Sequence, residues 1–214
     1  MSWDFETDPE FQKELDWIEA FVREEVEPLD HVLGFPYEVQ NPKRNALVHP
    51  LQAQVKKRGL WACHLGPELG GQGYGQVKLG LINEILGRSR FGPTVFGCQA
   101  PDSGNAEILA HYGTPAQKER YLKPLLDNQI VSCFSMTEPQ GGADPKVFTA
   151  RAELVGGEWV INGEKWFSSH AHVASFFIVM AVTDPDAPEY RRLSSFIVPA
   201  DTPETAVERL IHIV

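Results

Sequence analysis

The sequence is poor in cysteine, lacks a long apolar run and has no excess of basic residues, and each absence excludes a class of protein. The three cysteines, Cys63, Cys98 and Cys133, are widely spaced and show no metal-ligand pattern, so we expect no metal site. Three thiols cannot all pair, which favours a reducing compartment. The longest apolar run, 174–182, is interrupted at Ser175 and is far too short to span a bilayer.

Acidic residues outnumber basic ones, and the formal net charge is -10 at pH 7. Such a balance argues against nucleic acid, and against an anionic membrane surface, as the main partner. The N-terminal residues are acidic and lack the apolar segment of a signal peptide. We therefore expect a soluble, cytoplasmic protein with no nucleic-acid partner and no membrane partner.

The spacing of apolar residues divides the 214-residue chain into two halves, and up to about residue 128 this spacing is helical. A first helix is predicted after Asp8, which is a capping residue, with Pro9 at the first helical position and Pro28 at the end. Its apolar face consists of residues at steps of three and four: Phe11, Leu15, Ile18, Val22 and Val26.

Prolines and glycines shape the next part of this half. Residues 34–50 contain three prolines and are predicted to form a long loop, followed by a short helix over 51–58 that Gly59 ends. Residues 59–73 contain five glycines and no strand precedes them, so a tight loop is a better interpretation than a phosphate-binding motif. His64, within this loop, is interpreted as a packing or surface histidine.

Further helices are predicted before the spacing changes. Residues 114–117, Thr-Pro-Ala-Gln, form a capping box with proline at the first helical position. Pro124 should bend or end the helix that follows. The first half is therefore predicted to be an all-α bundle of four or five helices.

After this point the spacing becomes that of strands, with turn signals Gly-Gly at 156–157 and Asn-Gly at 162–163. The predicted strands cover residues 148–154, 159–161, 165–168, 176–182, 193–198 and the residues from 210 onward. Short strands at hairpin spacing predict an antiparallel sheet or a small barrel. The predicted fold class is α+β: an N-terminal all-α helical bundle over 1–129, followed by an incomplete antiparallel β-barrel domain over 130–214.

The joint between the halves, residues 133–144, is unusual for a plain linker. It contains a short β-prone run, then Thr-Glu-Pro, then two glycines and an acid. Pro139 fixes one backbone angle, whereas Gly141 and Gly142 allow positive φ and a close approach of the main chain to a ligand. Bare N–H groups in such a turn can bind an anion, and an ordinary interdomain loop is the alternative.

In this order, the motifs of the chain resemble those of the acyl-CoA dehydrogenase family. The most specific are the Thr-Glu-Pro signature within 136–144 and the Asn-Gly turn with its following residues, 162–169. The upstream stretches 59–73 and 100–105 are similar to the same family. The resemblance covers nearly the whole chain, residues 8–210.

The resemblance implies an FAD site between the helical and β domains, with the isoalloxazine ring against the β domain. The implied cofactor-binding residues are Phe134, Met136, Thr137, Gly142, Ala143, Phe167 and Ser169. Phe134, Met136 and Thr137 would line the flavin. Phe167 would lie on the ring face and the Ser169 hydroxyl near N5, where it can stabilise the reduced flavin. A core aromatic is the alternative role of Phe167.

Two of these residues depart from the family's pattern. At the position of Ala143 the family commonly has a serine, and that serine contacts the cofactor pyrophosphate or the acyl-CoA. Ala143 is therefore also the candidate substrate-binding residue. Losing that hydroxyl removes about 1 kcal/mol of hydrogen bonding, while the backbone amides of Gly142 and Ala143 remain. Phe167 stands where tryptophan is usual, so it keeps the stacking face and loses the indole donor.

The resemblance also implies a reaction, the α,β-desaturation of an acyl-CoA thioester, with electrons passed to an electron-transferring flavoprotein. In the family the catalytic glutamate lies on a C-terminal helical bundle that also makes most oligomer contacts, and this sequence contains no such bundle. We therefore assign no catalytic residue, Glu138 included. The chain is expected to be catalytically incomplete by itself, and a homo- or hetero-oligomer when complete.

Two other functions remain open at this point. A flavin-dependent monooxygenase or oxidase could use the same scaffold, although the Thr137-Glu138-Pro139 signature favours the dehydrogenase. A non-catalytic partner subunit is the third hypothesis, supported by Ala143 and by the missing bundle. No residue present fixes the length of the acyl chain.

Overall fold

The computed structural model describes residues 6–69, 71–142 and 144–210. Its α-helices are α1 (Pro9–Phe21), α2 (Leu29–Val32), α3 (Pro42–Arg58), α4 (Gly75–Leu86), α5 (Gly92–Phe96), α6 (Asp102–Tyr112), α7 (Pro115–Gln117) and α8 (Lys123–Leu126). Shorter turns are η1 (Val22–Val26) and η3 (Lys118–Leu122), which are π-helical, and η2 (Pro67–Leu69), η4 (Pro145–Val147) and η5 (Glu189–Arg191), which are 3-10. The strands are β1 (Ser132–Ser135), β2 (Arg151–Val155), β3 (Glu158–Asn162), β4 (Phe176–Val182) and β5 (Leu193–Pro199).

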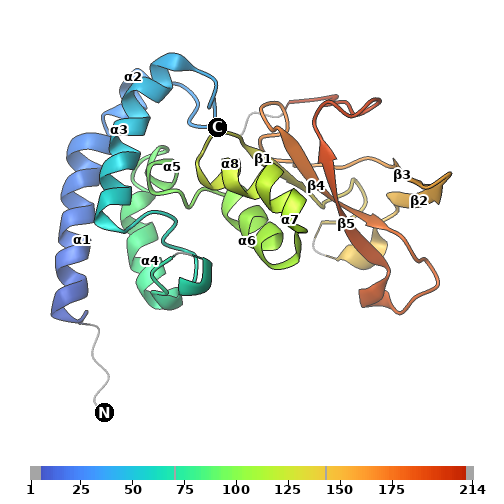
Figure 1. Ribbon diagram of the computed structural model, residues 1–214, viewed down its shortest axis with the longest axis horizontal. Helices are drawn as coiled ribbons and strands as arrows, with labels where there is room; N and C mark the ends of the chain where they lie inside the picture. Colours follow the sequence, from blue (N-terminus) through green and yellow to red (C-terminus); the bar gives the residue numbers. More distant parts are fainter. Residues whose placement is uncertain (1–5, 70, 143, 211–214) are drawn as a thin grey trace, which may run out of the picture.

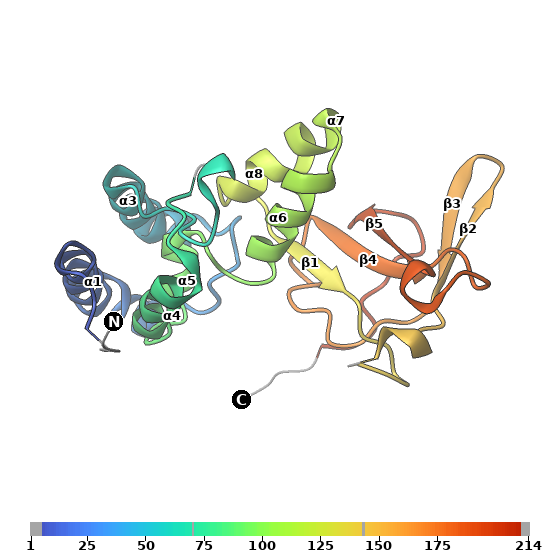
Figure 2. The same cartoon turned by 90° about the horizontal axis from the view of Figure 1, so that it is seen from below.

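Helices and strands occupy opposite ends of the longest axis of the molecule (Figure 1). Seen from below, α6, α7 and α8 lie between the other helices and the sheet (Figure 2). The predicted α+β organisation, a helical half followed by a β half, is confirmed. Among the described residues, no helix combines the length and the apolar character that crossing a bilayer requires.

Helix α1 begins where the sequence predicted. The Asp8 carboxylate accepts the Phe11 N–H at 2.9 Å, and Pro9 occupies the first helical position. One side of the helix is buried in the main core of the helical half, through Phe11, Leu15, Ile18 and Phe21. The capping of this end and the burial of this face together explain why the segment is helical.

The loop predicted over 34–50 is wrong in its second part, because α3 already begins at Pro42. Asn41 caps this helix by accepting two backbone N–H groups of its first turn, a signal that the proline count concealed. Pro50 lies inside the helix, where it removes one hydrogen bond. The neighbouring Val48 is fully buried, and burial of this helix face offsets the loss at Pro50.

Other helix ends follow the sequence more closely. Gly59 ends α3 in the left-handed conformation, with φ 78°. The capping box is formed, since Thr114 and Gln117 exchange side-chain and backbone hydrogen bonds. The helix neither stops nor breaks at Pro124: it passes through the wider turn η3 just before it and continues as α8.

The sheet is mixed rather than antiparallel, which corrects the prediction for the second half. β1 pairs in parallel with β4, from Ser132 opposite Phe176 to Ser135 opposite Val179. β5 runs antiparallel along β4, and β2 forms an antiparallel hairpin with β3. β2 meets β4 through one parallel pair, and the five strands do not close into a barrel within the described residues. The strands predicted over 176–182 and 193–198 are confirmed.

The strand predicted over 165–168 is wrong. Gly163 has φ 155°, and a Cβ built there would lie 2.4 Å from the Cβ of Ala150, so the chain passes close to the residue before β2 instead of turning back. The following residues form an extended loop that leads to β4. Apart from Leu210 itself, the strand predicted from residue 210 onward lies outside the described residues.

Buried hydrogen bonds join the helical half to the sheet. Asp102 at the start of α6 accepts the Ser132 N–H at 2.7 Å and the Ser132 hydroxyl at 2.6 Å, and Asn105 donates to the same hydroxyl at 2.8 Å. An apolar cluster shared by α6, α8 and β4 surrounds them, with Ala106, Leu109, Leu125, Phe176 and Ile178 at its centre. β1 is therefore held both by α6, through Ser132, and by its pairing with β4.

Candidate functional site

Two loops meet where β1 ends, and together they carry most of the predicted site residues. The Thr137 carbonyl accepts the Trp166 N–H at 2.8 Å. The Met136 carbonyl accepts from Lys165 Nζ at 2.9 Å, and the Ser135 hydroxyl donates to the Ser168 hydroxyl at 2.9 Å. These bonds connect positions that are about thirty residues apart in the chain, so the loops 135–138 and 165–169 form one unit, called the joined loops.

Glu138 is the centre of this unit. It is 3% exposed, and its carboxylate accepts from Lys165 Nζ at 2.8 Å and from the backbone N–H groups of Thr149 and Ala150 at 2.7 and 3.1 Å. Gln140 Nε2 and the Thr149 hydroxyl donate to it as well. Burial by itself would raise the pKa of Glu138, but the Lys165 ammonium and the N–H donors outweigh it and lower the pKa to about 2. Glu138 is therefore ionised near neutral pH and serves as a structural group rather than a general base.

The turn that follows Glu138 does not use its glycines as expected. Neither Gly141 nor Gly142 has a positive φ. Gly141 instead makes room for a neighbour: a Cβ there would lie 2.1 Å from Cγ2 of Val147, whose side chain would have to turn away. Glu138 and Gly141 exchange two backbone hydrogen bonds of 3.1 Å, which close the turn.

Phe167 is held out of the core. Its side chain is 63% exposed and its backbone is left-handed, with φ 54°, a conformation that costs an L-residue with a bulky side chain about 1 kcal/mol or more. Trp166 meets it edge-on at 5.9 Å, and the Trp166 indole donates to Glu164 at 2.7 Å. The alternative of a core aromatic is thus wrong, and Phe167 presents an exposed apolar ring one residue after the Trp166 N–H bond to Thr137.

Ser169 follows on the same loop and is exposed. The next residue, His170, packs under Tyr37, with ring centroids 3.7 Å apart, and Phe35 lies against both His170 and His172. Burial, and to a lesser degree the charge of His172, lowers the pKa of His170 to about 4, so the imidazole is neutral near pH 7. A loop of the helical half therefore supports the turn that carries Ser169.

That loop is itself fixed by a buried cation. Arg44, 1% exposed, donates to the Pro36 carbonyl at 3.0 Å and to the Asn128 side-chain oxygen at 2.7 Å. Burial lowers the pKa of Arg44 to about 10, which leaves it charged near neutral pH. The Pro36 carbonyl lies between the two aromatic residues Phe35 and Tyr37, so the guanidinium anchors the pair that covers His170.

The structure places the remaining predicted residues in different surroundings. Phe134 is half-buried and packs against the apolar cluster between α6, α8 and β4. Met136 and Thr137 are half-buried at the loop unit, whereas Gly142 is exposed. Ala143, predicted to contact both cofactor and substrate, lies outside the described residues. Met136, Thr137, Phe167 and Ser169 are therefore the predicted residues carried by the joined loops.

Sequence reasoning missed several residues that build the site. Lys165 was assigned to a strand, and its buried ion pair with Glu138 spans a separation that no local pattern reveals. The contact of Tyr37 with His170 joins residues of the two halves and is equally invisible in the sequence. No group of three or more His, Cys, Asp or Glu side chains that could hold a metal ion is found in the part of the chain that the structure describes.

Comparison with known proteins identifies this arrangement. Residues 8–129 match the N-terminal domain of acyl-CoA dehydrogenase, and residues 133–212 match its middle domain. Both are domains of an oxidoreductase class. The first match covers more than half of the chain, and the chain belongs to the acyl-CoA dehydrogenase family.

Individual relatives agree with this assignment. Acyl-CoA dehydrogenase family member 10 of Mus musculus is 34% identical over 220 residues, which cover 96% of this chain and 20% of that protein. The acyl-CoA dehydrogenase candidate FadE2 of Mycobacterium tuberculosis is 35% identical over 193 residues, 84% of this chain and 47% of that protein. A solved structure of a proposed acyl-CoA dehydrogenase from Mycobacterium abscessus superimposes with a TM-score of 0.84 at 36% identity, over 97% of this chain and 54% of that one. The chain spans about half the length of the mycobacterial relatives.

Flavin occurs among more distant structures of the same fold. A glutaryl-CoA dehydrogenase from Mycobacterium smegmatis was solved in complex with FADH2, and its TM-score against this chain is 0.64 at 24% identity. At that identity the likeness shows the fold alone.

Proposed function

We propose that this chain forms the helical and middle parts of an FAD-dependent acyl-CoA dehydrogenase. The reaction would be the α,β-desaturation of an acyl-CoA thioester, with electrons passed to an electron-transferring flavoprotein. The observation that carries this proposal is the exposed ring of Phe167, on the loop that the Trp166 N–H bond joins to Thr137. Family membership supplies the chemistry, and the joined loops supply a surface suited to a planar ring.

The described residues fit a flavin at this surface. Phe167 offers a ring face, and Thr137 and Ser169 carry hydroxyls that have no hydrogen-bond partner within the described ranges. FAD, when bound, would supply the hydride acceptor of the reaction. The protein would position the flavin: Phe167 would cover one face of its ring, and the hydroxyls of Thr137 and Ser169 would hydrogen-bond to the polar edge of the ring. The rigid support under these groups is the buried pair of Glu138 and Lys165.

The proton at the substrate α-carbon needs a base that these loops do not offer. Glu138 accepts five hydrogen bonds, and its pKa is lowered to about 2. Its carboxylate is therefore a weak base. We propose that the base belongs to a further segment or another chain, and that this chain alone does not desaturate acyl-CoA. The complete protein is proposed to be an oligomer that acts in cytoplasmic fatty-acid metabolism.

A spectroscopic experiment tests the proposal. The purified chain is mixed with FAD, excess cofactor is removed by gel filtration, and the visible spectrum of the protein fraction is recorded. A retained flavin band, shifted from that of free FAD, is the expected result. A colourless protein fraction would contradict flavin binding by this chain and would favour the non-catalytic subunit. Oxygen consumption on reduction of the retained flavin would favour a monooxygenase or oxidase.

A further inference from the structure

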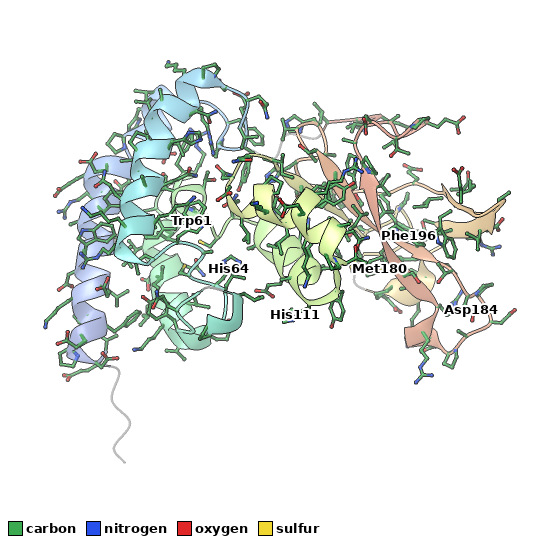
Figure 3. All side chains as sticks on the ribbon, in the orientation of Figure 1. Trp61, His64, His111, Met180, Asp184 and Phe196 are labelled. Carbon is green, nitrogen blue, oxygen red and sulfur yellow. The ribbon has the colours of Figure 1, made fainter. Side chains whose placement is uncertain are left out.

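Two of the three cysteines come from separate parts of the helical half and meet in its core. Cys63 follows α3 and Cys98 follows α5, and both pack into the main apolar cluster of that half. Cys63 is 1% exposed, whereas Cys98 is half-buried. Figure 3 labels Trp61 and His64, which stand on either side of Cys63 in the sequence, on the side of the helical half that faces α6. Neither thiol belongs to the joined loops.

A backbone hydrogen bond fixes the two segments against each other. The Ala62 N–H donates to the Phe96 carbonyl at 2.8 Å. Cys63 comes directly after the donor, and Cys98 comes two residues after the acceptor. The bond therefore holds the backbones that carry the two thiols at a fixed separation.

Gly97 allows this close approach. It has φ 67°, and a Cβ there would lie 2.6 Å from Cε2 of Trp61. The Trp61 ring is in turn held by its N–H bond to the Leu126 carbonyl, at 3.2 Å. The Cys98 N–H donates to the Pro93 carbonyl at 2.9 Å. Since these contacts hold both segments, the position of the two sulfur atoms does not depend on a bond between them.

The two thiols, both of them free, are hydrogen-bonded to each other. Because Cys98 donates and the Cys63 sulfur accepts, this bond lowers the pKa of Cys63. The same bond, together with burial, raises the pKa of Cys98 well above its ordinary value. Cys63 is therefore the thiol that ionises first, and a thiolate is the reactive form of cysteine.

A packing role accounts for Cys133 but not for this pair. Buried cysteine often serves as a small apolar residue, and Cys133 packs into a different cluster, with its sulfur 3.5 Å from the Ser135 hydroxyl. Packing alone gives no reason for two thiols to meet on segments that are fixed independently. A metal site does not account for them either, since the described ranges contain no group of three or more possible ligands.

We propose that Cys63 and Cys98 form a modification site at which hydrogen peroxide produces a reversible disulfide. The Cys63 thiolate attacks one peroxide oxygen, the O–O bond breaks, and the hydroxide that leaves takes a proton to become water. The Cys98 sulfur then attacks the resulting sulfenic acid, so that the S–S bond forms and the S–O bond breaks. The second hydroxide leaves as water with the Cys98 proton. Two thiols are oxidised and one peroxide is reduced to two waters.

The burial of Cys63 selects a small oxidant of this class, because a sulfur in a residue that is 1% exposed is closed to a bulky disulfide reagent. The new bond would enclose α4 and α5 in a covalent loop whose ends the backbone already holds together. Such a cross-link stabilises a chain mainly by restricting its unfolded state. The helical half would thus have a reduced form and a more stable oxidised form, which thiol reductants interconvert. This inference does not rest on the proposed function.

The first experiment locates the bond. Trypsin places the three cysteines on separate peptides, 59–78, 91–118 and 121–146. The reduced chain is treated with hydrogen peroxide, excess peroxide is removed, and the remaining thiols are blocked with N-ethylmaleimide in denaturant. We expect mass spectrometry of the monomer to show peptide 59–78 linked to peptide 91–118, with Cys133 blocked as the internal control. Dithiothreitol should release the two peptides.

The second experiment compares the Tm of the reduced and oxidised chains. Oxidation should raise Tm by about 5 °C or more, and dithiothreitol should reverse the rise. Cys98→Ser, at the half-buried position, should lose the rise, and Cys63→Ala provides a second variant without the pair. Cys133→Ala is the matched control, since it removes a buried thiol outside the pair and should keep the rise.

The outcomes decide the inference without reference to flavin. Three blocked thiols after peroxide treatment, a linkage through Cys133, or a sulfinic acid on Cys63 without linkage would overturn the modification site. A linked chain whose Tm falls would show that the bond distorts the fold, and would contradict thiols already placed for it. Retention or loss of FAD bears on the proposed function alone, so failures of the two proposals are distinguishable.

Discussion

The ammonium of Lys165 lies 2.8 Å from the carboxylate of Glu138, and only 10% and 1% of the two side chains are exposed. Lys165 also donates to the Met136 carbonyl, at 2.9 Å. One ion pair thereby holds the loop after β1 and the loop before β4 in register. The Thr-Glu-Pro signature, which the resemblance associates with cofactor binding, owes its glutamate to this structural task.

Removing the charge of Glu138 should therefore destabilise the chain strongly. Glu138→Gln leaves the Lys165 ammonium buried without a counter-ion, and we expect a loss of about 3 kcal/mol or more in the free energy of unfolding. Denaturant unfolding followed by circular dichroism measures this. The control is Glu10→Gln, which breaks the exposed pair of Glu10 with Lys13 and should change the free energy by less than about 0.5 kcal/mol. Similar losses in the two variants would contradict a buried pair.

The same carboxylate predicts how stability depends on pH. The folded-state pKa of Glu138 is about 2, below its ordinary value of 4.5, so its contribution is complete above about pH 5 and is lost as pH falls toward 2. The shift corresponds to about 3 kcal/mol. The stability difference between the wild type and Glu138→Gln should hence narrow between pH 5 and pH 2. A gap that stays constant over this range would show that the pKa is not lowered.

A substitution of Phe167 should change flavin binding without changing folding. Because its ring is 63% exposed, Phe167→Ala should barely change Tm, yet it removes the proposed ring face and should weaken FAD binding about tenfold. An alanine at position 167 must adopt the same left-handed backbone conformation, so the comparison with the wild type measures the loss of the ring alone. Tyr112→Ala, which removes an aromatic side chain that is 85% exposed on α6, is the control. Fluorescence titration with FAD distinguishes them, and equal affinities in both variants would place the flavin elsewhere.

Tyr37 should control the protonation of His170. Burial keeps the pKa of His170 at about 4, and the Tyr37 ring lies against the imidazole at a centroid distance of 3.7 Å. In Tyr37→Ala we expect the pKa of His170 to rise toward its ordinary value of 6.5, as measured by NMR titration of the imidazole. Since the folded-state pKa is depressed, wild-type stability falls as pH drops from about 6.5 to 4, and the variant should lose this dependence. An unchanged pKa in the variant would mean that other residues bury His170.

Local signals predicted the elements whose causes are local. Asp8 and the apolar steps after it defined α1, and Thr114 with Gln117 defined the capping box. Pro50 led to the wrong prediction of a loop. A proline in a helix costs a few kcal/mol, and burial along α3 can offset this cost, but the spacing of residues in the sequence does not show how much is buried. Asn162-Gly163 misled because the packing of Gly163 against Ala150, rather than a tight turn, decides the path there.

Long-range pairings decided the rest. Hairpin spacing favoured an antiparallel sheet, whereas β1 finds its parallel partner β4 some forty residues later, at a separation that leaves no local trace. The resemblance named Met136, Thr137, Phe167 and Ser169, all of which the joined loops carry. It could not name Tyr37, whose place under the site depends on the buried Arg44.

The parallel pairing of β1 with β4 also dictates an order of events during synthesis on the ribosome. The residues of the helical half emerge first and can collapse onto their own core, with β1 docked on α6 through Ser132. β1 can pair with β4 only after β4, which ends at Val182, has left the exit tunnel. β4 can likewise pair with β5 only after β5 has left it. A translational pause after β1 has left the exit tunnel and before β4 has done so would prolong the lifetime of an unpaired strand. Codon choice across this interval should consequently affect the soluble yield of the chain more than codon choice within α1 to α5.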